Sequence, residues 1–245
     1  MSIQTILPFV STVIMVIFTV SVLERYLVRR KLHFLFWGIG LAMFGAGSFA
    51  EAYFAFVGWS APVFFVWYLF GAALNAGWIG HGTMLLLTRR RWVHVFTVLL
   101  VLGSVVAAIG MLQIMPRLNA AGFNAALPIS EQYRTVMPKI SDGAWVRLTT
   151  PFFNIYGLLT LVGGALWSAM LFLRKQVLPN RVVGNVLIAA GALLIGLAST
   201  ATRLGYGQYL YLGELAAAVL MYTGFRAASA PATEAEKLAA EAQPA

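Results

Sequence analysis

The chain has no cysteine. Disulfides, thiolate metal ligands and cysteine nucleophiles are therefore excluded. Charge is also scarce, because 10% of the 245 residues are charged and 60% are hydrophobic. Soluble domains carry about 25% charged residues, so most of this chain's surface is expected to face lipid.

The net charge of +9 lies in short basic clusters between apolar runs. A nucleic-acid-binding surface would need basic residues gathered on one face or helix, so no nucleic acid partner is expected. The clusters are instead typical of the loops of a membrane protein.

Long apolar runs divide the chain, because a helix needs roughly 20 residues to cross about 30 Å of hydrocarbon. The pattern predicts an all-α, polytopic bundle of seven transmembrane helices. No cleavage site follows the first run, which we interpret as a retained helix and not a signal peptide. The predicted spans are Ile3–Leu23, His33–Val57, Ala61–Thr88, Val93–Met115, Pro151–Leu173, Val182–Thr202 and Tyr206–Phe225.

The basic clusters fall on alternate loops, which predicts the orientation, since cytoplasmic loops are enriched in Lys and Arg. The N-terminus is then outside and the C-terminus in the cytoplasm, and the expected location is a bacterial inner membrane. The anionic lipid surface or a cytoplasmic protein is expected at these loops. The cytoplasmic residues would be Arg25, Arg29, Arg30, Lys31, Arg89, Arg90, Arg91, Arg174, Lys175, Arg181, Arg226 and Lys237.

Two segments lie outside the predicted spans. The outer loop 116–150 mixes Pro, Asn and Gly with several aromatic residues, so it is expected to fold over the outer mouth of the bundle, a loose exposed loop being the alternative. The tail 226–245 is rich in Ala, Glu and Pro, and we expect it to be flexible and cytoplasmic. Residues 1–225 then form the seven-helix domain.

Two of the eight acidic residues, Glu51 and Glu214, fall inside predicted spans. A carboxylate inside a membrane is costly and is a functional candidate for that reason. At 1.5 Å per residue, both lie roughly 10 to 12 Å below the outer ends of their helices. Arg203 ends the preceding helix on the same side, and its long side chain could reach either carboxylate.

The helical period predicts that these side chains face the bundle interior. Glu51 shares a stripe with small residues, including Gly47 and Ser48, and Tyr211 lies on the face of Glu214. Arg203 ends a small and polar stripe of its helix, and Asn154 and Tyr156 reach a comparable depth. That stripe consists of Asn185, Ala189, Ala192, Gly196, Ser199, Thr200 and Arg203.

These residues permit two interpretations. Glu51, Arg203 and Glu214, walled by Tyr211, Asn154 and Tyr156, could form an outward-facing ligand pocket. They could equally be an ion-pair lock that only fixes helix packing. Two carboxylates against one arginine leave a charge or a shared proton unaccounted for, which favours the pocket.

No cofactor is expected. His33, His81 and His94 lie towards the cytoplasmic side at depths that make paired haem ligation strained, and metal ligands are scarce. A retinal Schiff base needs a buried lysine, but all four lysines lie in predicted loops or the tail. Catalytic motifs are also missing, so an enzyme is the less favoured class.

An internal duplication would give a 3+1+3 layout, as in several transporter folds. Gly45–Glu51 can be aligned with Gly196–Thr202, and Gly71 then falls near Gly213. Small-residue repeats also arise by chance in membrane helices, so both explanations stay open.

The stretch Phe36-Trp37-Gly38-Ile39-Gly40, then Glu51, then Trp67-Tyr68-Leu69-Phe70-Gly71 resembles the seven-helix sensor regions of bacterial histidine kinases. It is similar also to bacterial seven-helix membrane proteins of uncharacterised function. The resemblance covers about a quarter of the chain. It implies ligand sensing within the membrane, with the signal passed to a separate partner protein.

Sequence alone thus favours a sensor or ligand-binding module with an outward-facing polar pocket. A small-solute transporter of 3+1+3 layout is one alternative, and an accessory subunit of a larger membrane complex is another.

The predicted orientation can be tested with topology reporters. A reporter fused after Phe225 should be cytoplasmic, and one inserted near Ala125 should be external, because the basic loops stay on the cytoplasmic side. The reverse pattern would overturn the orientation and, with it, the direction in which the pocket opens.

Overall fold

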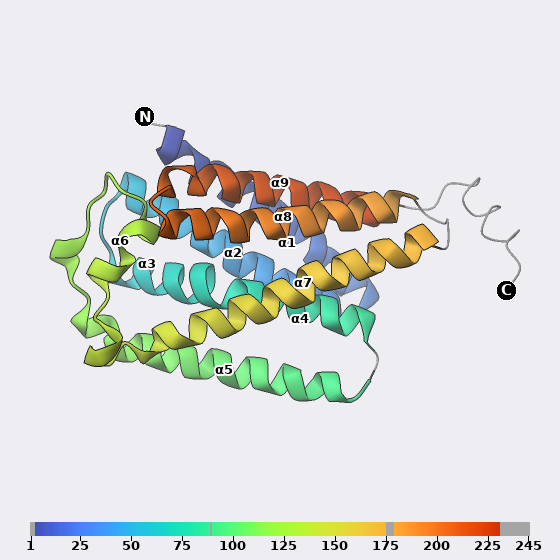
Figure 1. The fold of residues 1–245 in the computed structure, drawn as a ribbon, viewed down its shortest axis with the longest axis horizontal. Helices are drawn as coiled ribbons and strands as arrows, with labels where there is room; N and C mark the ends of the chain where they lie inside the picture. The colour runs from blue at the N-terminus through green and yellow to red at the C-terminus, as the bar shows by residue number, and fades with distance from the viewer. Residues whose placement is uncertain (1–2, 89, 175–178, 231–245) are drawn as a thin grey trace, which may run out of the picture.

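The computed structural model describes residues 3–88, 90–174 and 179–230, without the side chains of residues 3–5, 203 and 208. Every long element in this part of the chain is helical (Figure 1). The α-helices are α1 (Ile3–Arg29), α2 (Leu32–Phe56), α3 (Ala61–Val66), α4 (Asn75–Leu87), α5 (Trp92–Ile114), α6 (Ile129–Val136), α7 (Thr149–Arg174), α8 (Pro179–Arg203) and α9 (Leu210–Ala228).

Six of the seven predicted segments form helices that are long and apolar enough to cross a membrane, which makes the chain a multi-pass membrane protein. The seventh segment forms the 19-residue helix α9, which contains Glu214 and Arg226 and is not among these six. Its crossing of the membrane stays a prediction. Helix α9 continues to Ala228, so the first residues of the predicted tail are helical, and residues 231–245 lie outside the described part.

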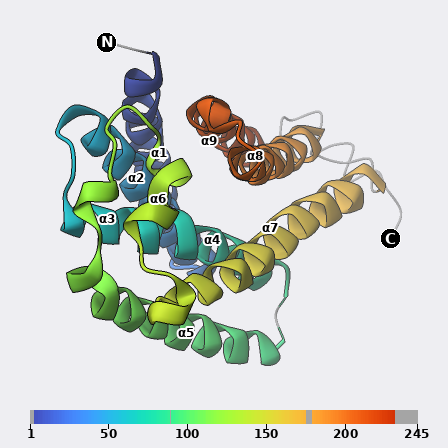
Figure 2. The same ribbon diagram turned by 60° about the vertical axis from the view of Figure 1, so that its left-hand side comes forward.

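Six of the long helices pack in a closed ring. Helix α1 packs on α2 and α9, α2 on α4, α4 on α7, α7 on α8, and α8 on α9. Helix α5 lies at the margin of the bundle (Figures 1 and 2). Its outward side chains, such as Val98, Leu102 and Val105, are about half exposed, as expected for a lipid-facing helix.

The two ends of the bundle differ in chemistry. At one end, called the α6 end, helix α6 and short 3-10 turns lie across the helix termini (Figure 1). At the opposite end, called the arginine end, α1 finishes at Arg29, α7 at Arg174 and α9 just after Arg226. Arg89, Lys175 and Lys237 lie outside the described residues.

The segment 116–150 is folded against the α6 end. Gln132 holds it in shape, because its side-chain amide donates to the carbonyls of Asn124 and Leu127 at 2.8 and 2.7 Å. Ile129 and Val136 of α6 are buried in the same apolar cluster as residues of α2 and α5. Phe123, Tyr133 and Trp145 of the segment pack against this cluster, so its aromatic residues serve packing over the helix ends.

The third span is not a regular α-helix. Between α3 and α4, residues Trp67–Leu74 form a π-helix (η1), which the periodicity did not predict. Where π-helical hydrogen bonding changes to α-helical bonding, one backbone carbonyl accepts no hydrogen bond within the helix. In lipid such a carbonyl needs another donor. The Asn75 side chain donates to the Gly71 carbonyl at 2.7 Å, and that of Asn154 to the Ala72 carbonyl at 3.0 Å.

Glycine allows α2 to pack directly on this π-helix. A Cβ atom at Gly47 would lie 2.5 Å from the Gly71 Cα. Small residues also meet between the last two helices, where a Cβ at Gly213 would lie 2.5 Å from that of Ala198. Close approach of backbones replaces the hydrophobic driving force that is missing between helices in lipid.

Gly47→Ala should lower the free energy of unfolding by about 1–3 kcal/mol, because the new methyl group meets backbone that cannot move aside. Gly163→Ala is the matched control, since nothing lies within 4 Å of a Cβ there. That change should be neutral or stabilising by up to about 1 kcal/mol, the helical advantage of alanine over glycine. Unfolding in detergent measures both, and equal effects would contradict the close contact.

Candidate functional site

Glu51 of α2 and Glu214 of α9 meet inside the bundle. Their carboxyl groups are within hydrogen-bonding reach of each other, although the residues are 163 positions apart. Glu51 is 4% exposed, and the Oε2 atoms of both residues are buried. A hydrogen bond between two carboxyl groups needs a proton, and two adjacent negative charges in a low dielectric are strongly unfavourable. The pair is therefore expected to hold a proton between its members. We call Glu51 and Glu214 the acidic pair.

The acidic pair receives little other support from the described chain. The Trp67 indole donates to Glu51 Oε1 at 3.0 Å. Apart from the partner carboxyl itself, no side-chain or backbone donor of the described residues reaches Oε2 of Glu51 or of Glu214, and the buried hydroxyl of Ser48, one turn from Glu51, also lacks a partner there. Buried polar atoms of this kind are uncommon in folded proteins and indicate a place where a proton, water or ligand group binds.

Helix α6 covers the acidic pair through Tyr211. The Tyr211 hydroxyl hydrogen-bonds the backbone of Ile129, at the start of α6, and the ring lies near Glu51 and Glu214. Glu131 packs against Gly207, since even a Cβ there would overlap the Glu131 carboxyl. Tyr211, which the sequence placed on the face of Glu214, thus joins the covering segment to the acidic pair.

Aromatic rings form the wall next to Glu51. Trp67 and Tyr68 of the π-helix each lie 6.1 to 6.2 Å from Tyr133 of α6, measured between ring centroids. Arg147 lies over the other side of this wall, with its Cζ 5.6 Å from the Tyr133 centroid. Sequence reasoning did not assign Trp67 or Tyr133 to the site. Trp67 was visible in the sensor-like motif, but nothing in the sequence places Tyr133 beside it.

The Arg203 side chain lies outside the described part of the chain, so its place in the site stays a prediction. The prediction that a polar stripe of α8 faces the bundle interior and ends at Arg203 is wrong at the outer end of that stripe. Ser199 and Thr200 are exposed, and Thr200 donates to the Gly196 carbonyl of its own helix at 2.8 Å. Helix α8 instead packs on α9 through smaller residues such as Gly191 and Ala198, because these permit close approach.

Asn154 and Tyr156 make their hydrogen bonds away from the acidic pair. Asn154 serves the Ala72 carbonyl at the end of the π-helix. Tyr156 instead bonds His81 of α4, with its hydroxyl 2.6 Å from Nδ1. No hydrogen bond joins either residue to the acidic pair, as a wall of the predicted pocket would be expected to make. A shared depth in the membrane does not fix which neighbour a side chain meets.

His81 is the centre of a second buried polar cluster. Its Nε2 lies 2.7 Å from Thr97 Oγ1, so hydroxyl groups of α5 and α7 occupy both ring nitrogens. The residue is 0% exposed. A neutral imidazole supplies one donor and one acceptor, which matches these two hydroxyls. The ring therefore ties α4, α5 and α7 together.

The other histidines lie apart from this cluster. His33 packs edge-on against Trp37, with ring centroids 5.2 Å apart, and His94 is exposed. Within the described residues, no three acidic or histidine side chains come together in a way that could hold a metal ion.

The fold and this site define a multi-pass helical membrane protein with a carboxyl pair buried under a helical cover. Searches against protein-family models, curated proteins and solved structures find no match.

The acidic pair can be tested by a double-mutant cycle. Glu51→Gln and Glu214→Gln should be non-additive in the free energy of unfolding, with a coupling on the order of 0.5–3 kcal/mol, because each removes the partner of the other. The measurement is unfolding of detergent-solubilised protein for the wild type, both single variants and the double variant.

Glu24→Gln is the control, since Glu24 belongs to α1 at the arginine end. Its effect should add to that of Glu51→Gln within about 0.5 kcal/mol. The same cycle with Arg203→Ala decides whether Arg203 belongs to the site. Strict additivity of Glu51→Gln and Glu214→Gln would show that the two side chains do not form one unit.

Proposed function

We propose that the protein is a ligand-binding sensor module of the membrane, and that the acidic pair is its binding site. The observation that carries the proposal is the pair of buried carboxyl groups beneath α6, whose Oε2 atoms find no donor among the described residues outside the pair. A purely structural lock would be expected to surround the pair with further donors from neighbouring helices, because an unmade buried hydrogen bond costs about 1–3 kcal/mol.

The chemistry of the site favours a small cationic ligand. Two carboxyl groups offer negative charge once their proton is lost, and Trp67 and Tyr211 add aromatic rings close by. Carboxylates beside aromatic faces are a common arrangement for binding ammonium groups. An organic ammonium ion that replaces the shared proton would thus meet both charge and ring faces.

Binding at this site would be coupled to α6. A ligand that enters from the α6 end meets the contacts of Tyr211 with Ile129 and of Glu131 with Gly207. Displacing these contacts moves the cover relative to α9, and α9 runs on to the basic residues at the other end. With the predicted orientation, this converts an external ligand into a change at the cytoplasmic loops, where a partner protein would receive it.

A 3+1+3 transporter is a second candidate, and one observation favours it. Gly47 and Ala198 are aligned in the possible duplication, and each packs against a glycine of the following helix, Gly71 and Gly213 respectively. A transporter would expose Glu51 alternately to both sides of the membrane, which labelling from each side can detect. A sensor would admit label from the outside only, and an accessory subunit would co-purify with its complex in mild detergent.

The proposed site can be tested with ethylammonium as the probe. Ethylammonium chloride should raise the melting temperature of the detergent-solubilised wild type above the effect of equal sodium chloride, because a ligand that binds only the folded state stabilises it. Glu51→Gln and Glu214→Gln should each abolish the difference. Asp142→Asn, a change at an exposed position, should retain it. An equal shift in wild type and Glu51→Gln would contradict binding at the acidic pair, as would no shift in the wild type from pH 5 to pH 9.

A further inference from the structure

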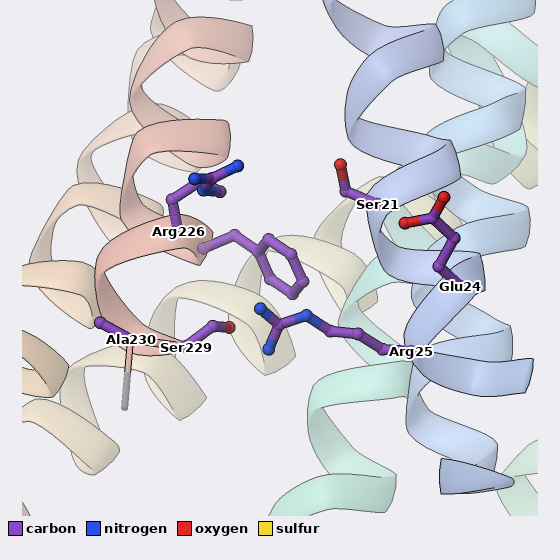
Figure 3. Close-up of a pocket in the computed structure, with 7 residues that line it drawn as sticks. Ser21, Glu24, Arg25, Arg226, Ser229 and Ala230 are labelled. Atoms are coloured by element: carbon purple, nitrogen blue, oxygen red, sulfur yellow. The ribbon is translucent and has the colours of Figure 1, made fainter. Parts of the chain in front are cut away.

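A separate polar pocket lies at the arginine end, between the last turns of α1 and α9 (Figure 3). Its volume is about 360 Å³. Helix α1 contributes Ser21, Glu24 and Arg25, and the end of α9 contributes Phe225 and Arg226, followed by Ser229 and Ala230.

Two guanidinium groups face this pocket from opposite walls. Figure 3 shows Arg25 reaching in from α1 and Arg226 from α9. Arg25 lies over the Phe225 ring, with its Cζ 4.7 Å from the centroid, so its position is fixed by packing. Like charges on facing walls repel each other, and an anion between them would remove that repulsion. The planar fork of arginine suits the oxygens of a phosphate group.

One carboxylate, that of Glu24, lines the same pocket. The formal charges of Arg25, Arg226 and Glu24 sum to +1, which suits a singly charged phosphodiester. Glu24 can accept a hydrogen bond from a hydroxyl group next to that phosphate. A choline group has no such donor.

The surroundings of the pocket favour a lipid as the source of such a phosphate group. Arg25 lies four residues before the end of α1, which places it roughly 6 Å along the helix from that end, near the boundary of the apolar span. On the same helices, towards the bundle middle, Ile17 and Val20 of α1 and Val219 of α9 are 40 to 49% exposed. Acyl chains could cover these side chains while the headgroup occupies the pocket.

We propose that this pocket binds the phosphate ester of an anionic phospholipid headgroup, with the phosphate between Arg25 and Arg226 and a headgroup hydroxyl on Glu24. The site is independent of the acidic pair. It links α1 to α9 at the end of the bundle opposite α6, and it gives the basic residues there a specific ligand in place of a diffuse attraction to the membrane.

Native mass spectrometry of the full chain in mild detergent tests this site. The probes are phosphatidylglycerol, phosphatidylcholine with the same acyl chains, and soluble glycerol 3-phosphate. The wild type should retain one phosphatidylglycerol in preference to phosphatidylcholine. Arg25→Gln and Arg226→Gln should each weaken that binding by about tenfold or more, as expected for loss of charge-assisted hydrogen bonds. Arg91→Gln, an exposed arginine outside the pocket, should change it less than about twofold.

Glu24→Gln provides a readout that a folding defect would not imitate. It removes the negative charge of the pocket but keeps an oxygen that accepts the headgroup hydroxyl, so phosphatidylglycerol should bind at least as tightly as to the wild type, whereas a folding defect would weaken its binding. Equal losses in Arg25→Gln, Arg226→Gln and Arg91→Gln would show diffuse electrostatic attraction and overturn the proposal. If glycerol 3-phosphate competes at the same concentrations as phosphatidylglycerol, the ligand is a soluble phosphate ester, and the assignment to a lipid is wrong.

Discussion

Two carboxyl groups inside an apolar bundle constrain the helices that carry them. Glu51 and Glu214 can remain buried because each lies within hydrogen-bonding reach of the other, and this requires α2 and α9 to keep a fixed relative height and rotation. The third span also contributes to the environment of the acidic pair. Its π-helical part brings Trp67 to Glu51, and the contact of Gly47 with Gly71 holds that part against α2. Helix α6 then closes the arrangement through Tyr211.

Much of the fold could be predicted from the sequence because the spans depend on simple properties. Apolar length places the long helices within a few residues, and the small-residue stripe correctly turns Glu51 inward. The π-helix could not be predicted, since its hydrogen-bond shift leaves no periodic signal over eight residues. The face of α8 was misplaced at Ser199 and Thr200, and Thr200 shows the reason, because its hydroxyl bonds its own helix and need not face inward.

The candidate site was predictable only in part. Two intramembrane carboxylates are conspicuous in a sequence, and similar depth suggested that they meet. The depth of a residue does not, however, predict the direction in which its side chain points. It therefore could not predict that Tyr156 bonds His81 or that Asn154 bonds the backbone of the π-helix. The contributions of Tyr133 and Ile129 come from a segment whose fold depends on tertiary packing. Helix α9 connects the two polar regions, because it carries Glu214 near the α6 end and Arg226 at the arginine end, roughly 18 Å apart along the helix axis.

The shared proton of the acidic pair is the central physical claim, and infrared spectroscopy measures it directly. The wild-type protein at neutral pH should show the carbonyl stretching band of a protonated carboxylic acid in a nonaqueous environment. Glu214→Gln should shift that band, because it changes the hydrogen-bond partner of Glu51, and the Glu51→Gln/Glu214→Gln double variant should lack it. A wild-type spectrum without the band, or a band that survives unchanged in the double variant, would contradict the account.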